Sequence, residues 1–461
     1  MGGEVQLIIE PGPARLAELA ADPPAGELAG RPLSAWRKLT RDHLGLPADV
    51  PIVATGHQTL LWHPGILAKY LLVEAMTAVD DRLASANLVV DQHTGPFGQF
   101  EVPLRRPDGS LGITTIMLSG YRAEVPMGEH AAFDPPLAPS DLPLALPSVG
   151  QGLERIFGAV TAARGEPDAA MQMAVALDRL MSHWLAPAPK VRASLLVGTP
   201  LGRLLVRLMA REPDRCARLY NEAVASTGVR DISPLAISAE AVELPLWVID
   251  EAGRRRRATD RDVQAWDSGQ AAPTRLLPRA LLLTALVRVG MCDVFIHGTG
   301  GAAYDRAMEL WVQRWLGIQP SPCGIATATL RLPLGGGGDA VDLDEARRAV
   351  RRLWHDPQRA ARRGGASGRK QAFLELIVGA PRRSRRRREL FGHMHGYLKQ
   401  QRRVHAAAIG DARGRVQTGA RQQAEAPIIA RRTWPFPLYP KEMIDRLAEE
   451  VAQLVAGGQQ R

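Results

Sequence analysis

The stretch IVATGHQTLLWHPGILAKYLLVEAM (52–76) decides the fold of this chain. It begins as an apolar run, passes through Thr-Gly-His-Gln and His-Pro-Gly, and then becomes a regular helical pattern. A proline at the start of the helical part suits the first turn of a helix. In an open α/β sheet, the ligand binds where a strand ends and the next helix begins. The stretch therefore predicts a strand that stops at a ligand, followed by a helix on the far side of that ligand.

Short apolar runs like the first one recur along the chain, at 51–55, 87–91, 192–197 and 292–297. Each run is apolar at successive positions, as expected for a strand that is covered on both faces. All but the third are separated from a neighbouring run by at least one amphipathic stretch. This alternation predicts an α/β fold with a parallel, doubly wound sheet.

The predicted core spans residues 1–340 and contains two hairpins, at 100–118 and 244–259, with Pro-Asp-Gly-Ser and Glu-Ala-Gly as their turns. The first hairpin precedes a proline-rich loop at 134–148 and two helical patterns. These features predict an inserted subdomain at roughly 98–190.

The composition changes after LPLGGGGDA (332–340), where four successive glycines predict a flexible joint. The following residues, 341–425, show helical patterns that predict a C-terminal helical hairpin. Residues 426–461 form the predicted tail and last helix, which pack on the core. Three prolines exclude regular structure from ARRTWPFPLYP, so its aromatic residues are expected to fix the tail to the core. These are Trp434, Phe436 and Tyr439.

The totals limit the class of protein. The chain has 461 residues, a formal net charge of +10 and only 5% aromatic residues. The arginine runs 254–257 and 382–388 lack the interleaved aromatic residues that stack on bases, so we interpret them as solvated faces. A nucleic-acid-associated protein remains an alternative. The N-terminus lacks a secretory pattern, the three cysteines stand far apart, and no apolar run reaches a membrane span of ~18–20 residues. These features predict a cytoplasmic protein without a membrane partner.

Histidines and glycines follow three of the apolar runs. Because parallel strands end at the same edge of a sheet, these loops are expected to meet there. Glycines at such an edge let backbone N–H groups approach an anion. The predicted substrate-binding residues of the first and last loops are Thr55, Gly56, His57, Gln58, His297, Gly298, Gly300 and Gly301.

The second loop supplies the predicted catalytic residues, His93 and Asp91. A histidine titrates near neutral pH, so His93 is a candidate general base, and Asp91 would orient it. Next to the loops, the helix start at His63 and Gly65 is expected to meet an anionic group, with Lys69 one turn further. Tyr304, after the glycine loop, completes the predicted site.

A metal site is the alternative interpretation of these loops, with His57, Asp91, His93 and His297 as ligands of a hydrolase or transferase. No HExxH motif accompanies them. The residue types alone leave both interpretations open.

The order of these motifs resembles that of the cysteine-adding enzymes of bacillithiol biosynthesis. That family has a strand ending in Thr-Gly-Gln-Gln, a Gly-Pro turn and a helix with a Tyr/Lys pair, where this chain has 55–58, 64–65 and 69–70. The family's second strand ends in Glu-Asp-His-Asp, and this chain has Asp-Gln-His-Thr at 91–94. Its last strand ends in Gly-Gly-Pro-Gly-Glu-Ile-Ala-Tyr, and residues 298–304 are similar without the glutamate.

The resemblance implies a Rossmann-like core related to class I aminoacyl-tRNA synthetases and nucleotidyltransferases. It also implies a helical coiled-coil region that pairs two copies into a homodimer. The implied activity joins cysteine to an anionic sugar–malate acceptor through an amide bond. An adenine nucleotide is one candidate for the activating cofactor, although no KMSKS-like loop is present. Departures from the family pattern at His57, Gln92, Thr94 and Ala302 fall in the substrate loops, which leaves the acceptor open.

Overall fold

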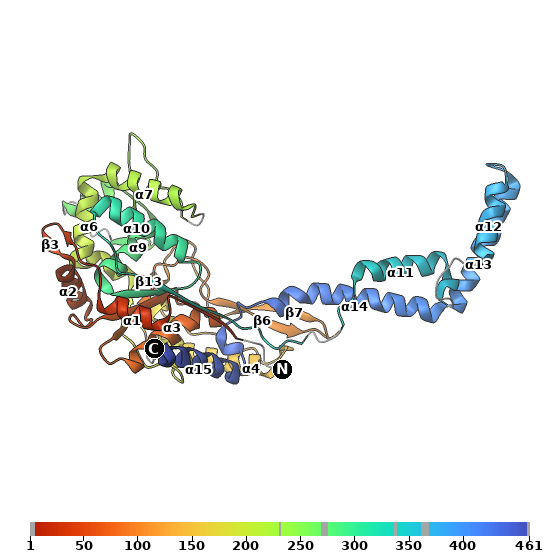
Figure 1. Cartoon of the computed structure of the whole chain (residues 1–461), viewed down its shortest axis with the longest axis horizontal. Helices are drawn as coiled ribbons and strands as arrows, with labels where there is room; N and C mark the ends of the chain where they lie inside the picture. Colours follow the sequence, from red (N-terminus) through yellow and green to blue (C-terminus); the bar gives the residue numbers. More distant parts are fainter. Residues whose placement is uncertain (1–4, 230–231, 269–274, 336–338, 361–367, 459–461) are drawn as a thin grey trace. The chain divides into compact units, whose positions relative to one another are not determined.

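The computed structural model describes residues 5–229, 232–268, 275–335, 339–360 and 368–458 (Figure 1). Over these residues the chain is a mixed α/β protein built around a six-stranded sheet in the order β1-β13-β12-β4-β5-β8. The strands of this sheet are β1 (Gln6–Glu10), β4 (Ile52–His57), β5 (Ala84–Val89), β8 (Lys190–Arg192), β12 (Val294–His297) and β13 (Cys323–Thr329). All neighbours pair in parallel except β1, which runs antiparallel to β13. The predicted α/β class with a mostly parallel sheet is confirmed.

Helices follow most of the strands. The helices in the same compact unit as the sheet are α1 (Pro13–Ala21), α2 (Leu33–Leu44), α3 (Pro64–Val79), α4 (Pro147–Ala162), α5 (Ala169–Met181), α6 (Pro200–Arg211), α7 (Pro213–Thr227), α8 (Asp260–Asp267), α9 (Leu281–Leu286) with its π-helical continuation η3 (Val287–Met291), α10 (Ala302–Leu316) and α15 (Lys441–Gly458). Several begin with proline, whose fixed φ suits the first helical turn. Among the described helices, none is both long and apolar enough to span a membrane.

The sheet core explains why successive strand residues are apolar. Ile52 and Ala54 of β4 belong to a buried cluster that also contains side chains of α6, α7, α9 and α10. Helix α3 packs against β13, β4, β5 and β12. Its Leu67 and Leu72 are fully buried outside that cluster. Because alternate residues of a strand point to opposite faces, a strand between two apolar layers needs apolar residues at every position.

The predicted strand at 192–197 is wrong. Strand β8 ends at Arg192, and Ala193–Gly198 form a 3-10 helix, η2. The backbone N–H and the hydroxyl of Ser194 both donate to the carboxylate of Asp91, at 3.0 and 2.5 Å. These bonds draw the chain out of the sheet, and Thr199 then caps α6. An apolar run by itself does not distinguish a strand from a short buried helix.

The two predicted hairpins are present. Strand β6 (Gln99–Arg105) pairs with β7 (Leu111–Met117). Strand β9 (Glu243–Ile249) pairs with β10 (Arg255–Thr259) on one side and with β11 (Arg275–Pro278) on the other. A minor sheet pairs β2 (Glu27–Leu28) with β3 (Arg31–Pro32).

The aromatic residues of the proline-rich tail are buried, as predicted. Trp434 and Tyr439 are fully buried and Phe436 is nearly so. The backbone N–H of Phe436 donates to the carbonyl of Trp62 at 2.6 Å, and the hydroxyl of Tyr439 donates to the carbonyl of Leu330 at 3.1 Å. The tail is thus fixed beside the chain segments that leave β4 and β13.

The chain divides into two compact units. Unit 1 comprises residues 1–104, 113–332 and 432–461, and unit 2 comprises 105–112 and 333–431. Unit 2 contains the helices α11 (Leu343–His355), α12 (Gly368–Gly379), α13 (Arg385–Val404) and α14 (Ala406–Ala430). Within it, α11 packs on α14 and α12 packs on α13. The domain limits predicted from the sequence remain predictions, and most of the predicted glycine joint, 336–338, lies outside the described residues.

Candidate functional site

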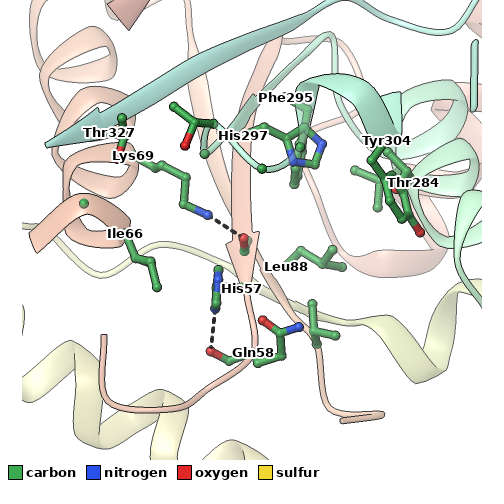
Figure 2. Close-up of a pocket in the computed structure, with 18 of the residues that line it drawn as sticks. His57, Gln58, Ile66, Lys69, Leu88, Thr284, Phe295, His297, Tyr304 and Thr327 are labelled. Atoms are coloured by element: carbon green, nitrogen blue, oxygen red, sulfur yellow. Dashed lines mark hydrogen bonds between the residues drawn. The ribbon is translucent and has the colours of Figure 1, made fainter. Parts of the chain in front are cut away.

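A cavity of about 450 Å³ opens in unit 1 at the carboxyl ends of β4, β5 and β12 (Figure 2). In this view Lys69 and Ile66 lie at the left, and His297, Tyr304 and Thr284 at the right. The lining residues come from both sides of the strand ends: Gly56, His57, Gln58, His63, Gly65, Ile66, Lys69, Leu88, Val90, Leu283, Thr284, Val287, Phe295, His297, Gly298, Thr299, Gly300, Gly301, Tyr304, Thr327 and Arg432. The predicted edge of the sheet is therefore hollowed, and loops distant in sequence meet there.

Most of the substrate-binding residues predicted from the sequence line this cavity. They are Gly56, His57, Gln58, His63, Gly65, Lys69, His297, Gly298, Gly300, Gly301 and Tyr304. Three predicted residues, Thr55, Asp91 and His93, are not among the lining residues.

Gly56 allows β4 and β5 to approach each other at the cavity floor. A Cβ added to Gly56 would lie 2.5 Å from Cβ of Leu88 and 2.7 Å from the carbonyl oxygen of Leu88, which no side chain tolerates without a shift. The carbonyl of Gly56 accepts a hydrogen bond from Nζ of Lys69 at 2.8 Å. The glycine thus fixes both the strand spacing and the position of the lysine.

Lys69 is a buried cation in the cavity wall, with only 3% of its surface exposed. Burial lowers the pKa of Lys69 from its ordinary 10.5 to about 7. No described carboxylate pairs with it, and its bond to Gly56 is to a neutral carbonyl. A buried amine without a counter-charge is suited to meet an anion or to act as a nucleophile or base.

His57 and His63 are uncharged at neutral pH. Burial, with Lys69 nearby, lowers the pKa of His57 to about 3. Burial, with Arg432 and Lys69 nearby, lowers the pKa of His63 to about 4. His63 is the N-cap of α3, and its Nδ1 accepts from the backbone N–H of Gly65 at 3.1 Å, so the ring hydrogen is on Nε2. Both imidazoles are available as neutral hydrogen-bonding groups.

The glycine loop after β12 faces the cavity from the other side. A Cβ added to Gly298 or Gly300 would meet nothing within 4 Å, so both positions border open space. A Cβ on Gly301 would lie 2.6 Å from Nδ1 of His297, so only glycine lets the loop pack against that imidazole. Helix α10 begins directly after this loop. Backbone N–H groups at a helix start, flanked by glycines, can hold a phosphate or carboxylate.

Thr55 has a structural role rather than the predicted substrate contact. It is fully buried, and its hydroxyl donates to the carbonyl of Ile296 at 2.9 Å. This bond joins β4 to β12 one residue before the cavity begins. Strand residues alternate in direction, which explains why Thr55 points away from the space that Gly56 borders.

The sequence predicts that Asp91 orients His93, but the described hydrogen bonds of the Asp91 carboxylate go to other residues. This carboxylate accepts from Nε of Arg192 at 2.9 Å and from Ser194, and Arg192 also pairs with Asp168 at 2.9 Å. His93 lies outside the cavity lining, where burial and the charge of Arg255 lower its pKa. It is still close enough to His57 to contribute to the lowered pKa of that ring.

The metal alternative has no ligand set in the described part of the chain. No group of three His, Cys, Asp or Glu side chains there has the arrangement needed to hold a metal ion. Asp91, one of its four proposed ligands, is paired with Arg192.

The arginine run 254–257 supports the hairpin rather than a nucleic acid. Arg254, Arg256 and Arg257 pair with Asp250, Asp262 and Glu243. Arg255 lies over the ring of Trp247, 4.0 Å from its centroid, and donates to the carbonyl of Gln92. The alternative of a nucleic-acid surface gains no support at this run.

Sequence reasoning missed several lining residues, of which Arg432 and Thr327 matter most. Arg432 is exposed and donates to the hydroxyl of Thr329 at 3.3 Å. Its position two residues before Trp434 could have indicated this. Because Trp434 fixes the tail to the core, the residues just before it must also lie close to the core. Thr327 lies on β13, a strand of small residues that lacks the strongly apolar run of the others.

The charged side chains that line the cavity are of one sign. Lys69 and Arg432 are its cationic side chains, and no aspartate or glutamate is among the described lining residues. The starts of α3 and α10 both border the space, and each adds partial positive charge. The arrangement favours an anionic ligand.

The chain matches no protein-family model, and no curated protein matches it significantly in sequence. The residues of the cavity therefore carry the functional argument.

Proposed function

We propose that the protein is an amide-forming ligase, which joins cysteine or a similar amino acid to a small, anionic, amine-bearing acceptor of the sugar–malate type. The observation that carries the proposal is the composition of the cavity. It collects residues of the first and last motifs on which the resemblance rests, and no acidic residue lies among its described lining. The same proposal includes a Rossmann-like identity for the sheet and pairing of two copies through α11–α14.

The anionic end of the acceptor would bind between the two helix starts. The loop at Gly298–Gly301 offers backbone N–H groups on one side, and Gly65 lies in the first turn of α3 on the other. Arg432 supplies a full positive charge nearby, and Lys69, with its pKa of about 7, supplies a partial one at neutral pH. If an adenine nucleotide activates the amino acid, its phosphates would use the same features, since phosphates favour helix starts flanked by glycines.

The chemistry requires an activated acyl group and a proton acceptor. The acceptor amine attacks the acyl carbon, the C–N bond forms, and the bond to the leaving group breaks with its electron pair. The amine gives up a proton to a base. His93 is the base predicted from the sequence, but it lies outside the cavity lining, so a residue that lines the cavity is better placed to take the proton.

A binding screen followed by product analysis tests the proposal. Thermal unfolding is measured with ATP, ADP, cysteine and amine-bearing sugar carboxylates, because a ligand at 100 times its Kd stabilises the fold by about 2.7 kcal/mol. Mixtures that bind are then analysed by mass spectrometry for the amide product. Lys69→Met should remove binding, whereas Lys38→Met, at an exposed lysine paired with Asp49, should not. Absence of both a thermal shift and an amide product across the panel would reject the proposal.

A further inference from the structure

Next to the glycine loop, three side chains contact one another in a row. Buried Arg288 contacts buried Asp305, and Asp305 contacts His297, which lines the cavity. Oδ2 of Asp305 lies 3.0 Å from Nε2 of His297, and Oδ1 of Asp305 lies 3.3 Å from Nη1 of Arg288. Both Asp305 and Arg288 are 1% exposed. Arg288 is held in turn by the carbonyl of Ser321 at 2.6 Å. A carboxylate buried this deeply has its charge compensated on one side and meets an imidazole on the other.

The two ring nitrogens of His297 have different surroundings. Nε2 is buried and faces Asp305 at ion-pair distance, without the alignment of a hydrogen bond. The side chain nevertheless keeps 19% exposure, which therefore belongs to atoms other than Nε2, and His297 lines the cavity. A carboxylate beside one nitrogen favours the proton on that nitrogen, as in His–Asp pairs generally. Nδ1, which packs beside Gly301, is then left with its lone pair.

The other imidazoles of the cavity lack such support. Nδ1 of His63 is occupied by the backbone N–H of Gly65. Nδ1 of His57 lies 3.2 Å from the carbonyl of Gln58, and no described carboxylate contacts the ring. A neutral imidazole becomes positively charged when it takes up a proton. Among these three rings, His297 is the best placed to do so, because it lies beside the carboxylate of Asp305.

We propose that His297 takes the proton from the attacking amine through Nδ1, and that Asp305 is a positioning residue that holds the ring and stabilises its charged form. The inference rests on the proposed ligase activity. In the step, the amine nitrogen forms the C–N bond while its N–H proton moves to the lone pair of Nδ1. The imidazolium so formed faces Asp305 and later releases the proton to the leaving group or to water.

The groups that influence this pair come from three elements. On η3, Arg288 balances the charge of Asp305. On β13, burial and Asp305 raise the pKa of the Cys323 thiol to about 12, so it stays neutral. On α10, Glu309 pairs with Nη2 of Arg288 at 2.5 Å, and burial raises the pKa of Tyr304 far above its usual value. Asp305 is therefore the carboxylate nearest to His297 among the described residues.

Kinetics of two matched variants test the roles. Asp305→Asn keeps the size of the side chain but removes its charge, so kcat should fall about 100-fold or more while KM changes little. Glu309→Gln removes a carboxylate that pairs with the same buried arginine, without touching His297, and should keep kcat. Equal losses in the two variants would reject the positioning role.

Nitrogen NMR of the histidine side chains tests the ring independently of the reaction. In wild-type protein labelled with ¹⁵N-histidine, and assigned by loss of one signal in His297→Gln, His297 should carry its hydrogen on Nε2. In Asp305→Asn, the hydrogen should distribute between both nitrogens, while Glu309→Gln should resemble wild type. A hydrogen on Nδ1 in wild type would overturn the inference even if ligation is found. The expected tautomer without any ligation would instead reject the proposed function.

Discussion

At the scale of single residues, Lys69 couples the cavity to the stability of the fold. In the folded protein burial lowers the pKa of Lys69 to about 7, whereas the unfolded chain keeps the ordinary value of 10.5. Between about pH 7 and pH 10 the unfolded state therefore binds one more proton, and this residue makes stability rise with pH in that window.

Replacement of Lys69 by methionine should remove this dependence. We expect Lys69→Met to be more stable than wild type at pH 7, since no charge is buried, and to show a flatter rise towards pH 10. Urea unfolding at several pH values measures the free energy of unfolding of both proteins. The contributions of other titrating groups are the same in the two proteins and cancel in the difference. Parallel curves for the two proteins would show that Lys69 is not buried as described.

Gly56 gives a second prediction at this scale. A methyl group there meets Leu88 at 2.5 Å, so Gly56→Ala should destabilise unit 1 by about 1–3 kcal/mol. Gly158→Ala in α4 is the matched control. Its added carbon meets nothing within 4 Å, and alanine in a helix should stabilise by up to about 1 kcal/mol. Denaturant midpoints compare the two, and a neutral Gly56→Ala would contradict the tight approach of β4 and β5.

At the scale of elements, the loop between β12 and α10 should accept anions through its backbone. Gly300 borders open space, so Gly300→Ala should fold normally and keep most of its ligand affinity. Gly300→Asp places a carboxylate at the same point, and we expect it to lower the affinity for an anion at least about 10-fold. Calorimetric titration with the ligand found in the screen measures both. Equal affinities would show that the loop does not hold the anion.

The elements also show what sequence reasoning can reach. Residues that follow parallel strands must meet at one edge, so the convergence of His57 and His297 was predictable from the pattern alone. The hydrogen-bond partners of Asp91 were not predictable in this way. Arg192 and Ser194 lie about a hundred positions away in sequence and reach Asp91 only through the pairing of β5 with β8. Arg432 joined the site for a similar reason, through the burial of the proline-rich tail, which contains the 3-10 helix η5 (Phe436–Leu438).

At the scale of the whole molecule, the two units differ in the size of their apolar cores. A described cluster in unit 2 has Ile377, Met394 and Leu398 as its buried members, with four partly buried neighbours, and the other buried apolar residues of this unit include Ile409 and Ala412. Unit 1 has an extensive core around its sheet. A small core stabilises less, so unit 2 is expected to open first.

A substitution in the smaller core tests this difference. Leu398→Ala should destabilise the helices of unit 2 by about 2–5 kcal/mol and leave ligand binding in unit 1 unchanged. Leu72→Ala, at a fully buried position of α3, should instead lower the stability of unit 1. Hydrogen exchange followed by mass spectrometry locates each effect. A loss of protection throughout the chain from Leu398→Ala would show that the units unfold together.

The cap of α3 makes this helix sensitive to acid in an unusual way. Most helix caps are hydroxyl or carboxylate groups, which still accept a hydrogen bond in mild acid, but here the acceptor is the imidazole nitrogen of His63. Once that nitrogen binds a proton, below about pH 4, it can no longer accept from Gly65, and its new charge repels the helix start. Elution or storage in acidic buffers should therefore fray the first turn beside the ligand space before the rest of the fold responds.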